Sequence, residues 1–591
     1  MPSSQNTSGA GASRSDEGRV SGGAGAPRGW TGRLSAAGSL LVAGGPASLV
    51  RRAHRFFERR REEKTPVQEA FRAWLDRNRP GPRELRLLAR AVAALPDLPL
   101  LDVATLGGAG GGPAGEKAPG IEEALPLYPR AASAIALPRD ATGEEVRGAL
   151  SRSRADWVLF LLEGWTLRPD ALLRIALALR DRPGVLFLFG DEEIETGGPG
   201  GALPLLKPGW SPELFRAAFY VGWPVGVRRR EALARADRLS GRGAAAVYEL
   251  LLRLHETPGA VLPVSSILAR RAAPPAPPAG PGLETDGDEA MRRALATWAA
   301  ERFPGASVLP GRAPGSWRLR RARSGRPGVS VIVPTRDGVE WLRRCIPSAL
   351  RERPLEILIV DNGSRGAATL DYLGALEKDG AARVLPFPGR FNFSAMMNAA
   401  ARAARGEFLL FLNDDTEVLE PGSIDAMAEE AESSDVGAVG ALLLYPDGAI
   451  QHAGLVVGMG VVAGHVFRGL LPEGNGCFVS PLLPREVSAV DGACFLVRKS
   501  LFLELGGFDA EGLPVSFADV DFCLRAREKG RRTVYTPHAV FLHHESRTRA
   551  PVLDQREVVR MERRWGRVLT SDPFYHPALS LLGESPRPRL A

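Results

Sequence analysis

Short apolar runs alternate with amphipathic segments through the second half of the chain. The apolar runs are short and rich in aliphatic, β-branched and aromatic residues, as in strands buried on both faces, and they cover residues 329–334, 355–360, 382–385 and 408–412. Segments with helical character separate them, at residues 339–350, 369–378 and 392–405. This alternation predicts an α/β fold built on a Rossmann-like, mostly parallel sheet.

A weaker copy of this pattern occurs earlier in the chain. Residues 157–161 form an apolar run that leads through a turn to a proline and a helix, as residues 408–412 do. The turn reads LEGW at 162–165 in the first copy and NDDT at 413–416 in the second. We interpret the two as an internal repeat whose first copy has lost its polar turn, the alternative being a chance similarity of two buried strands.

Composition divides the chain into four parts. Residues 1–65 are rich in Gly, Ser, Ala and Arg without an apolar period, and are expected to be disordered and basic. Their basic stretch at 51–61 has two interpretations: a helix on an acidic membrane, or a solvated helical face, which we favour. Two α/β domains are expected at 85–310 and 325–560, with a Pro-rich linker at 272–282, followed by a tail at 561–591 that frays after about Pro577.

Bulk properties narrow the class of protein. The 591 residues are 44% hydrophobic, which suffices for large cores in two to four domains. The net charge of +8 favours anionic partners, although a biased genome composition explains it equally well. The four cysteines form no CxxC pair, so neither a disulfide framework nor a zinc site is indicated. With no apolar run of about 18–20 residues and no signal peptide, we expect a cytoplasmic protein, or one attached to the inner face of the plasma membrane.

Two polar clusters directly follow predicted strands, where α/β sheets place function. Asp361 follows residues 355–360 and can accept hydrogen bonds from a ribose or a base, although such a turn needs no ligand. Asp414 and Asp415 follow residues 408–412, and their carboxylates repel each other unless solvent or a cation compensates. Mg²⁺ or Mn²⁺ is such a cation, and a solvated turn is the alternative.

A third polar cluster lies near the end of the second domain. Asp519 and Asp521 are expected in the first turn of a helix, where they either cap the helix or, in the case of Asp519, act as a general base. His543 and His544 follow a strand-like run at 533–542. A neutral imidazole there could complete a metal shell, and a surface histidine pair is the other interpretation.

Taken in order, these motifs resemble the inverting, GT-A-fold glycosyltransferases of family 2, with most similarity to rhamnosyltransferase-like enzymes of bacterial surface polysaccharide assembly. The resemblance covers residues 328–550. The motifs that carry it are VSVIVPTRDG (329–338), VDNGS (360–364), FNFSAMMN (391–398), GEFLLFLNDDTEV (406–418), VDGACFLVRKSLFLELGGFD (490–509), FADVDFCLRAREKG (517–530) and HHESRTRA (543–550).

The resemblance implies a donor side and a metal side for the site. The residues expected to line the nucleotide-sugar pocket are Pro334, Thr335, Asp361, Asn413 and Asp414. Asn413 through Asp415 stand in the place of the DxD motif, with Asn413 nearer the ribose. The expected ligands of a divalent metal, Mn²⁺ or Mg²⁺, are Asp415 and one of His543 and His544.

The resemblance also implies a base and an acceptor side. Asp519 is expected as the catalytic base, and Asp491, Gly492 and Asp521 are expected on the acceptor side. The sequence departs from the family pattern twice. Asn413 replaces the first acid of DxD, and Ala518 replaces the usual Glu before the base, which puts one hydrogen bond to the acceptor in doubt.

The first domain resembles the family in a degenerate form. Its Asp191-Glu192-Glu193 and the segment 206–214 look like parts of the N-terminal module of two-module relatives. The turn at 162–164 lacks paired acids, so we expect this domain to hold a metal poorly and to be inactive.

The resemblance implies transfer of a sugar from a nucleotide-sugar donor to a carbohydrate or lipid-linked saccharide acceptor, in synthesis of cell-surface polysaccharide such as O-antigen. Three alternatives stay open: a non-catalytic carbohydrate-binding or assembly scaffold, a nucleotidyltransferase and a nucleic-acid binder. The second usually has a Gly-rich signature after the first strand, which this sequence lacks. No nucleic-acid motif is present, so we expect no nucleic-acid partner.

Overall fold

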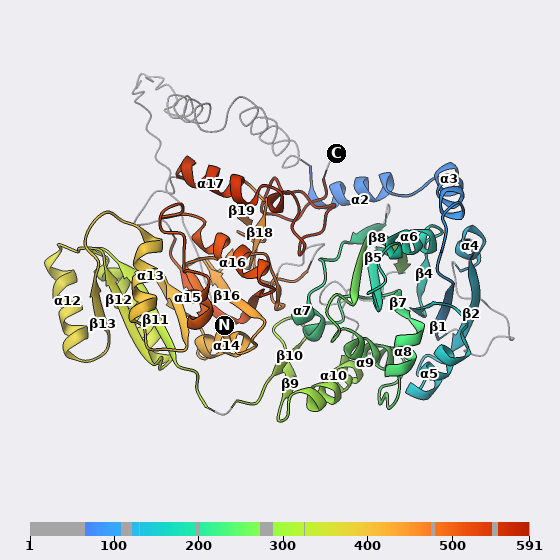
Figure 1. Cartoon of the computed structure of the whole chain (residues 1–591), viewed down its shortest axis with the longest axis horizontal. Coiled ribbons are helices and arrows are strands. Elements are labelled where there is room, and N and C mark those ends of the chain that lie inside the picture. The colour runs from blue at the N-terminus through green and yellow to red at the C-terminus, as the bar shows by residue number, and fades with distance from the viewer. Residues whose placement is uncertain are drawn as a thin grey trace, which may run out of the picture. The chain divides into compact units, whose positions relative to one another are not determined.

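The computed structural model describes residues 65–107, 121–128, 130–195, 201–271, 288–323, 325–473, 479–545 and 553–589 (Figure 1). The N-terminal region expected to be disordered, its basic stretch and the Pro-rich linker lie outside these residues, apart from Thr65. Among the helices described, none combines the length and the apolar content that crossing a bilayer requires. The mixed α/β fold expected from the sequence is confirmed.

A first, eight-stranded sheet has the order β2-β1-β3-β7-β5-β8-β4, with β6 beside β5. Its strands are β1 (Leu101–Leu106), β2 (Ala131–Leu137), β3 (Trp157–Leu162), β4 (Trp165–Leu167), β5 (Phe187–Glu195), β6 (Ala202–Leu205), β7 (Val225–Arg228) and β8 (Val261–Arg271). We call this sheet and its helices the first module.

The helices of the first module precede, connect and follow these strands (Figure 1). They are α2 (Val67–Arg77), α3 (Pro82–Ala93), α4 (Ile121–Ala124), α5 (Gly143–Arg152), α6 (Ala171–Leu179), α7 (Pro212–Ala217), α8 (Arg229–Arg235), α9 (Ala244–Leu254) and α10 (Asp288–Arg302). A hairpin of β9 (Ser307–Pro310) and β10 (Trp317–Arg320) leads to the second sheet.

The second, ten-stranded sheet has the order β13-β12-β11-β14-β21-β16-β22-β15, with β17 beside β16 and β20 beside β22. Its strands are β11 (Val329–Thr335), β12 (Glu356–Asp361), β13 (Arg383–Pro386), β14 (Phe408–Leu412), β15 (Thr416–Val418), β16 (Val436–Leu444), β17 (Ile450–His452), β20 (Arg485–Glu486), β21 (Cys494–Arg498) and β22 (Arg532–His543). A separate pair is formed by β18 (Leu455–Val457) and β19 (Ala463–His465). We call this the second module.

Helices cover both faces of the second sheet. They are α11 (Val339–Arg351), α12 (Ala367–Lys378), α13 (Phe393–Ala403), α14 (Ser423–Ala431), α15 (Lys499–Glu504), α16 (Ala518–Glu528) and α17 (Gln555–Trp565). Val331 and Val333 of β11 belong to the hydrophobic cluster that includes α11, α12 and α14, whereas Ile332 belongs to the cluster that includes α13, α15 and α16. Neighbouring residues of a strand point to opposite faces, so the all-apolar runs reflect a sheet buried on both sides.

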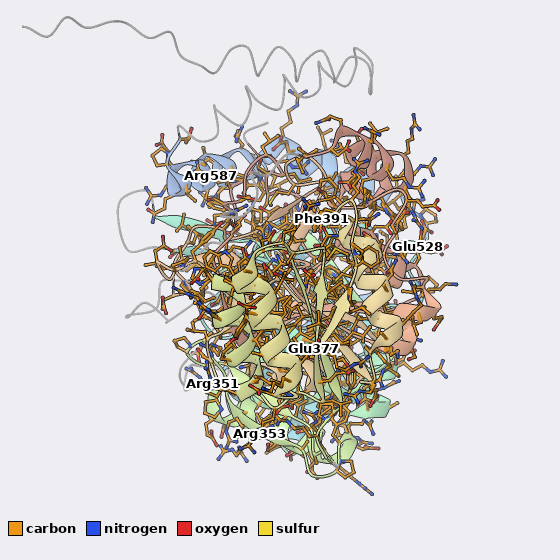
Figure 2. The ribbon with its side chains drawn as sticks, turned by 90° about the vertical axis from the view of Figure 1, so that its left-hand side faces the viewer. Arg351, Arg353, Glu377, Phe391, Glu528 and Arg587 are labelled. Atoms are coloured by element: carbon orange, nitrogen blue, oxygen red, sulfur yellow. The ribbon has the colours of Figure 1, made fainter. Side chains whose placement is uncertain are left out.

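The helical layer at one edge of the second module can be followed in Figure 2, where Glu377 marks α12. Phe391 lies toward the end where β13 leads into α13, and Arg351 and Arg353 lie toward the other end, where α11 leads into β12 (Figure 2). The end marked by Phe391 is therefore the carboxyl edge of the parallel strands, where the polar clusters of the sequence are expected.

The two sheets share one topology. The first strand order becomes the second from β12 onward when β2, β1, β3, β7, β5, β8 and β4 are replaced by β12, β11, β14, β21, β16, β22 and β15; β13 is an additional edge strand of the second sheet. The directions agree as well: β3 pairs antiparallel with β7 as β14 does with β21, and β5 pairs parallel with β8 as β16 does with β22. This correspondence supports the predicted internal repeat.

Most predicted elements agree with the structure, and two boundaries differ. The predicted strand 408–412 coincides with β14, and the ends of the other predicted strands and helices of the second module differ from the structure by at most two residues. The tail expected to fray after Pro577 is instead packed: Leu579 is fully buried, and the backbone N–H of Arg589 donates to the carbonyl of Ala578 at 2.9 Å. The expected boundary at 560 falls inside α17, whose apolar residues Val558 and Trp565 are buried.

An ion pair holds α17 against α16. The Asp521 carboxylate is fully buried; it accepts from Arg525 Nε at 2.7 Å and from the indole N–H of Trp565 at 2.9 Å, and it lies 3.1 Å from Arg564 Nη1. Removing the carboxylate would leave a buried guanidinium and an indole N–H without their acceptor.

We therefore predict that Asp521→Ala lowers the free energy of unfolding by about 3 kcal/mol. Chemical denaturation followed by circular dichroism measures this. Asp371→Ala, on the exposed side of α12, is the matched control and should change stability by less than about 0.5 kcal/mol. Equal stability of the two variants would contradict a structural role for Asp521.

Candidate functional site

Three strand ends meet at one edge of the second sheet. The turn Asn413-Asp414-Asp415 connects β14 to β15, and β15 pairs with the end of β22 so that Thr416 lies opposite His543. On the other side, β14 pairs with β21 and Leu412 lies opposite Cys494. The backbone N–H of Asn413 also donates to the carbonyl of Ala493 at 3.0 Å. Segments far apart in sequence thus bring the acidic turn, Asp491-Gly492 and His543 together.

Asp415 and His543 form a buried pair within this edge. The distance from His543 Nε2 to Asp415 Oδ1 is 3.3 Å, and both side chains are less than a tenth exposed. Burial alone lowers the pKa of His543, but the hydrogen bond to Asp415 and its charge outweigh burial and raise that pKa. The other ring nitrogen, Nδ1, is buried and has no hydrogen-bond partner among the described residues.

Asp414 is held apart from Asp415 by a different contact. Its Oδ2 accepts from the hydroxyl of Thr335 at 2.7 Å, at the end of β11. A Cβ at Gly338 would lie 2.5 Å from the same oxygen, so a larger residue there would displace the Asp414 carboxylate. Burial is the main cause that raises the pKa of Asp414 to about 7, and the charge of Asp415 adds to the effect.

The donor set at this turn fits a hard divalent cation. Asp415 offers a carboxylate oxygen and His543 an imidazole nitrogen, and both ligand types are used by Mn²⁺, while carboxylate oxygens suit Mg²⁺. The adjacent Asp414 carboxylate brings a second negative charge into a half-buried position, which a cation would compensate.

The expected nucleotide side lies at the ends of β11 and β12. Pro334 and Thr335 end β11, and Asp361 ends β12. The Asp361 Oδ1 atom accepts from the backbone N–H and the hydroxyl of Ser364, at 3.0 and 2.5 Å, so this carboxylate closes its own turn. No described residue donates a hydrogen bond to its second oxygen, Oδ2, which is the candidate contact for a ribose or a base. Beside it, Asn362 is buried and its Oδ1 has no partner among the described residues.

A single hydrogen bond links Asp519 to Gly492, in the segment that lies beside the acidic turn. Asp519 belongs to the first turn of α16. This helix begins directly after Phe517, whose φ of 63° is in the left-handed region that bulky residues rarely adopt. The Oδ2 atom of Asp519 accepts from the backbone N–H of Gly492 at 2.7 Å. Burial first, and then the charge of Asp491, raise the pKa of Asp519 to about 7. A carboxylate with that pKa is suited to take a proton near neutral pH.

Two of the predicted site residues point elsewhere. His544 Nε2 lies 2.8 Å from Glu417 Oε1, and its ring packs on Trp341 with centroids 4.9 Å apart. His543 and His544 are neighbours at a strand end and so face opposite sides, which leaves His543 alone beside Asp415. Asp521 is enclosed by its ion pair with Arg525, a position that does not fit the acceptor role expected for it.

Two buried histidines at the site were missed in the sequence. His452 ends β17 and His465 ends β19, and both lie beside Asp491. The distance from His465 Nε2 to Asp491 Oδ2 is 3.4 Å. The sequence signal was weak: His452 lies two residues before Gly454 and His465 directly follows Gly464, and no spacing rule connects either to the acidic motifs.

The first module lacks this chemistry at corresponding positions. The residue before β15 is Asp415, whereas the residue before β4 is Gly164. The first residue of β15 lies opposite His543 in β22, whereas the first residue of β4 lies opposite Arg271 in β8. An arginine cation thus occupies the position of the histidine, and no side chain occupies that of the carboxylate.

A buried ion pair fills the rest of that region of the first module. The registers of β7 and β21 make Gly222 the counterpart of Gly492 and Val221 the counterpart of Asp491. Lys207 Nζ donates to the carbonyl of Val221 and to Glu192, and both charged side chains are almost fully buried. Glu192 in turn accepts from the backbone N–H of Trp223 at 2.9 Å.

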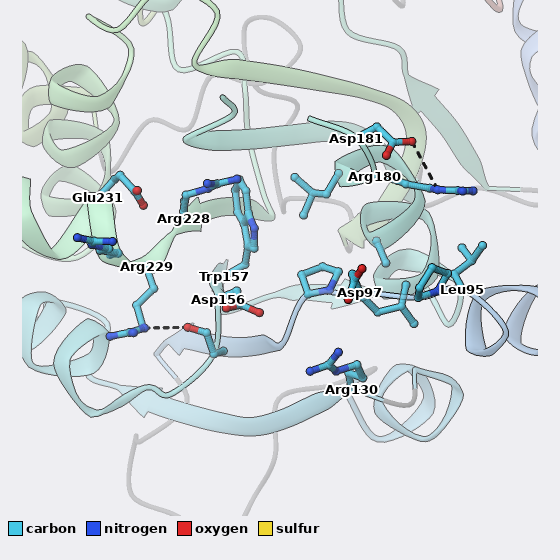
Figure 3. Close-up of a pocket in the computed structure, with 17 residues that line it drawn as sticks. Leu95, Asp97, Arg130, Asp156, Trp157, Arg180, Asp181, Arg228, Arg229 and Glu231 are labelled. Atoms are coloured by element: carbon cyan, nitrogen blue, oxygen red, sulfur yellow. Dashed lines mark hydrogen bonds and ion pairs between the residues drawn. The ribbon is translucent and has the colours of Figure 1, made fainter. Parts of the chain in front are cut away.

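An open cavity of about 720 Å³ lies at the amino ends of β1 and β3 in the first module (Figure 3). Arg130, Asp156 and Arg229 line it, and the Arg228 guanidinium lies 5.6 Å from the centre of the Trp157 ring. This is the opposite edge of the sheet from the turn before β4, so the cavity is separate from the position that corresponds to the acidic turn.

Comparison with known proteins gives a consistent family. The model for glycosyl transferase family 2 matches residues 330–506. The O-antigen biosynthesis protein RfbC of Myxococcus xanthus is 36% identical over 453 residues, which are 74% of this chain and 35% of RfbC. The protein y4gI of Sinorhizobium fredii is 35% identical over 463 residues, 75% of this chain and 51% of y4gI. The chain therefore spans about half of one of these relatives and about a third of the other.

A shorter relative is covered more fully. The N-acetylglucosaminyl-diphospho-decaprenol L-rhamnosyltransferase of Mycobacterium tuberculosis is 31% identical over 220 residues, 34% of this chain and 69% of that enzyme. Among solved structures, GalNAc-T7 with UDP, GalNAc and Mn²⁺ aligns at 17% identity and a TM-score of 0.36, over 49% of this chain and 61% of that one. With its acidic turn, buried carboxylate and matched motifs in order, the chain belongs to glycosyltransferase family 2 and has the GT-A fold of that family.

Proposed function

We propose that the second module transfers a sugar, with inversion, from a nucleotide-sugar donor to a hydroxyl of a carbohydrate or lipid-linked saccharide acceptor. The observation that carries this proposal is the convergence of two unlike acidic groups. Asp415 is paired with His543, and Asp519, with a pKa of about 7, is tied through Gly492 to the segment that binds the backbone of Asn413.

The relatives support a setting for this reaction. One is named for O-antigen biosynthesis and another for rhamnosyl transfer to a decaprenol-linked saccharide. We propose that this chain likewise acts in assembly of cell-surface polysaccharide, in the cytoplasm or at the inner face of the plasma membrane.

Asp415 and His543 would hold the divalent cation, Mn²⁺ or Mg²⁺. When bound there, the cation supplies positive charge that stabilises the leaving diphosphate. Pro334, Thr335 and Asp361 would line the nucleotide pocket, with Asn413 near the ribose. Asp414 stays on the donor side, because its hydrogen bond to Thr335 turns it toward β11.

Asp519 would act as the base. One of its carboxylate oxygens takes the proton of the acceptor hydroxyl while the acceptor oxygen forms a bond to the anomeric carbon. The bond from that carbon to the diphosphate oxygen breaks on the opposite face, and its electron pair leaves with the nucleotide diphosphate. Each Asp519 oxygen accepts from one backbone N–H, Oδ2 from Gly492 at 2.7 Å and Oδ1 from Val520 at 2.8 Å, and a remaining lone pair of the carboxylate takes the acceptor proton. Asp491 and Gly492 would thus border the acceptor.

The first module would contribute architecture without turnover. Gly164 and Arg271 stand where Asp415 and His543 stand in the second module, and the Lys207–Glu192 pair fills the adjoining interior. A guanidinium at the cation position repels Mn²⁺, so one metal site per chain is expected.

The transfer itself is tested with the full chain, MnCl₂ and a panel of nucleotide sugars, with release of nucleoside diphosphate as the readout. We predict that Asp519→Asn lowers kcat by at least about 100-fold because the amide cannot accept the proton, while the Kd for donor stays within threefold. Asp371→Asn is the exposed control and should keep full turnover. Wild-type turnover retained in Asp519→Asn would refute the base assignment, and donor binding without any turnover by the wild type would favour a non-catalytic scaffold.

Metal binding is tested by thermal denaturation. We predict that Mn²⁺ with a productive nucleotide sugar raises the Tm of the wild type by at least about 3 °C, since the ligands bind only the folded state. Asp415→Ala and His543→Ala should lose the Mn²⁺-dependent part of this shift. His544→Ala should keep it, because that side chain faces Glu417. Loss in His544→Ala with retention in His543→Ala would reverse the assignment.

The pH profile tests the state of the base. The pKa of Asp519 is raised to about 7, and the base must be ionised, so kcat/KM should fall as pH drops below about 7, by tenfold per unit well below it. Donor affinity measured over the same range separates this effect from Asp414, whose pKa is also about 7. A profile flat down to about pH 5 would contradict the assignment.

A further inference from the structure

Two histidines beside the base have no part in the proposed transfer. His452, at the end of β17, is fully buried, and His465, at the end of β19, is about one-sixth exposed. Both reach Asp491, which directly precedes the glycine that contacts Asp519. An imidazole pair enclosed at this depth needs partners for its polar atoms, and the contacts of the pair show what they are.

The three side chains form one chain of polar contacts. His452 Nε2 accepts from two backbone N–H groups, those of Gly454 at 3.3 Å and Asp491 at 3.4 Å. A nitrogen that accepts carries no proton, so the proton of the neutral His452 ring is on Nδ1. That atom lies 3.2 Å from His465 Nδ1, which must then accept, and this places the proton of His465 on Nε2. His465 Nε2 lies 3.4 Å from Asp491 Oδ2, so the ring N–H and the carboxylate are in polar contact.

The neutral state of His452 agrees with its surroundings. Burial is the main cause that lowers the pKa of His452 to about 3. Asp491, by contrast, offers a carboxylate: its Oδ1 accepts from the backbone N–H of Ala493 at 2.8 Å, a contact that favours the ionised form. The chain therefore runs from two backbone donors through two neutral rings to one carboxylate.

A metal ion at these three residues is disfavoured by the same geometry. Their ligand atoms lie within 4.8 Å of one another, close enough for a shared cation. A metal on His452 Nδ1 would require the ring proton to move to Nε2, where two N–H groups already point. The buried Nε2–H of His452 would then face the backbone N–H groups of Gly454 and Asp491, and these donors would have no acceptor between them.

The chain ends on the peptide that holds the base. Asp491 is fixed at three atoms: Oδ2 by His465, the backbone N–H by His452, and Oδ1 by the N–H of Ala493 at 2.8 Å. The next N–H along the chain, that of Gly492, is thereby aimed at Asp519 Oδ2, 2.7 Å away. A Cβ at Gly492 would lie 3.3 Å from that oxygen, so the approach leaves little spare room.

We propose that His452 and His465 are positioning residues for the transfer: by fixing Asp491 they aim the Gly492 N–H at Asp519 and hold the base toward the acceptor. This inference rests on the proposed function and adds residues that touch neither substrate nor metal. Asp491 gains a second role, because its carboxylate charge also raises the pKa of Asp519.

The test compares three variants of the full chain, with the nucleotide sugar and acceptor that the wild type turns over. His465→Leu removes the ring N–H beside Asp491 and should lower kcat about 10-fold or more, with donor KM and the Mn²⁺-dependent thermal shift unchanged. His465→Gln offers an amide N–H in place of Nε2–H and should restore kcat to within about threefold of wild type. His538→Leu, a half-buried histidine in β22, is the matched control and should keep kcat within twofold.

A spectroscopic readout tests the chain of polar contacts without substrate. The eight histidines are labelled with ¹⁵N and their tautomers read from long-range ¹H–¹⁵N correlations, assigned by the loss of signals in single variants. The expected result is Nδ1–H on His452 and Nε2–H on His465 at neutral pH. This measurement uses the wild type, so it decides the tautomers even where His465→Leu does not fold.

Any one of three results would overturn the inference. They are a kcat of His465→Leu equal to that of the wild type, a ring proton on Nε2 of His452, and binding of one zinc ion per chain that is lost in His465→Leu. A parallel loss of donor affinity and kcat that Gln does not restore would also overturn it, since that pattern indicates a purely structural role. Failure of the proposed function is distinct from all of these, because then the wild type itself shows no turnover with any donor.

Discussion

The candidate site depends on the way β14 is held inside the second sheet. This strand pairs with β11 on one edge and with β21 on the other, and its side chains are buried on both faces. Because β14 is paired on both edges and packed on both faces, the turn that follows it is rigid. The acidic side chains after Leu412 therefore have defined positions before any ligand binds. The neighbouring pairs β14–β21 and β15–β22 then determine what faces that turn: Gly492 and the base on one side, and His543 on the other.

The first module shows that the strand arrangement can be kept without the polar side chains of the candidate site. It keeps the strand order, the strand directions and even the glycine at position 222, yet it carries glycine, arginine and valine where the second module has Asp415, His543 and Asp491. A buried Lys207–Glu192 pair satisfies the interior instead. Fold and packing are therefore maintained by the apolar strands, and activity by a handful of polar side chains at their ends.

The sequence predicted the strands of the second module well because they are apolar throughout. It placed Asp415 after a strand and Asp519 at the start of a helix, because strand ends and helix starts are local features. It could have separated His543 from His544, since consecutive strand residues face opposite sides. The role of Asp521 was wrong for a different reason: its partners Trp565 and Arg564 come from a helix some forty residues away. His452 and His465 were missed because β17 and β19 pair locally with β16 and β18. Only the contact of this region with the segment at Ala489 and Asp491 brings the two rings to Asp491.

The packed C-terminal tail has a practical consequence for anyone who isolates the catalytic half. Its residues reach back to the hairpin that carries His465: the carboxylate of Glu584 accepts from the backbone N–H of His465 at 3.4 Å, and that of Asp572 accepts from the N–H of Val457 at 2.8 Å. An expression fragment trimmed where the family motifs end would sever α17 and strip these anchors from the hairpin. Such a fragment would retain every recognisable motif and still lose the contacts that hold the hairpin beside the candidate site.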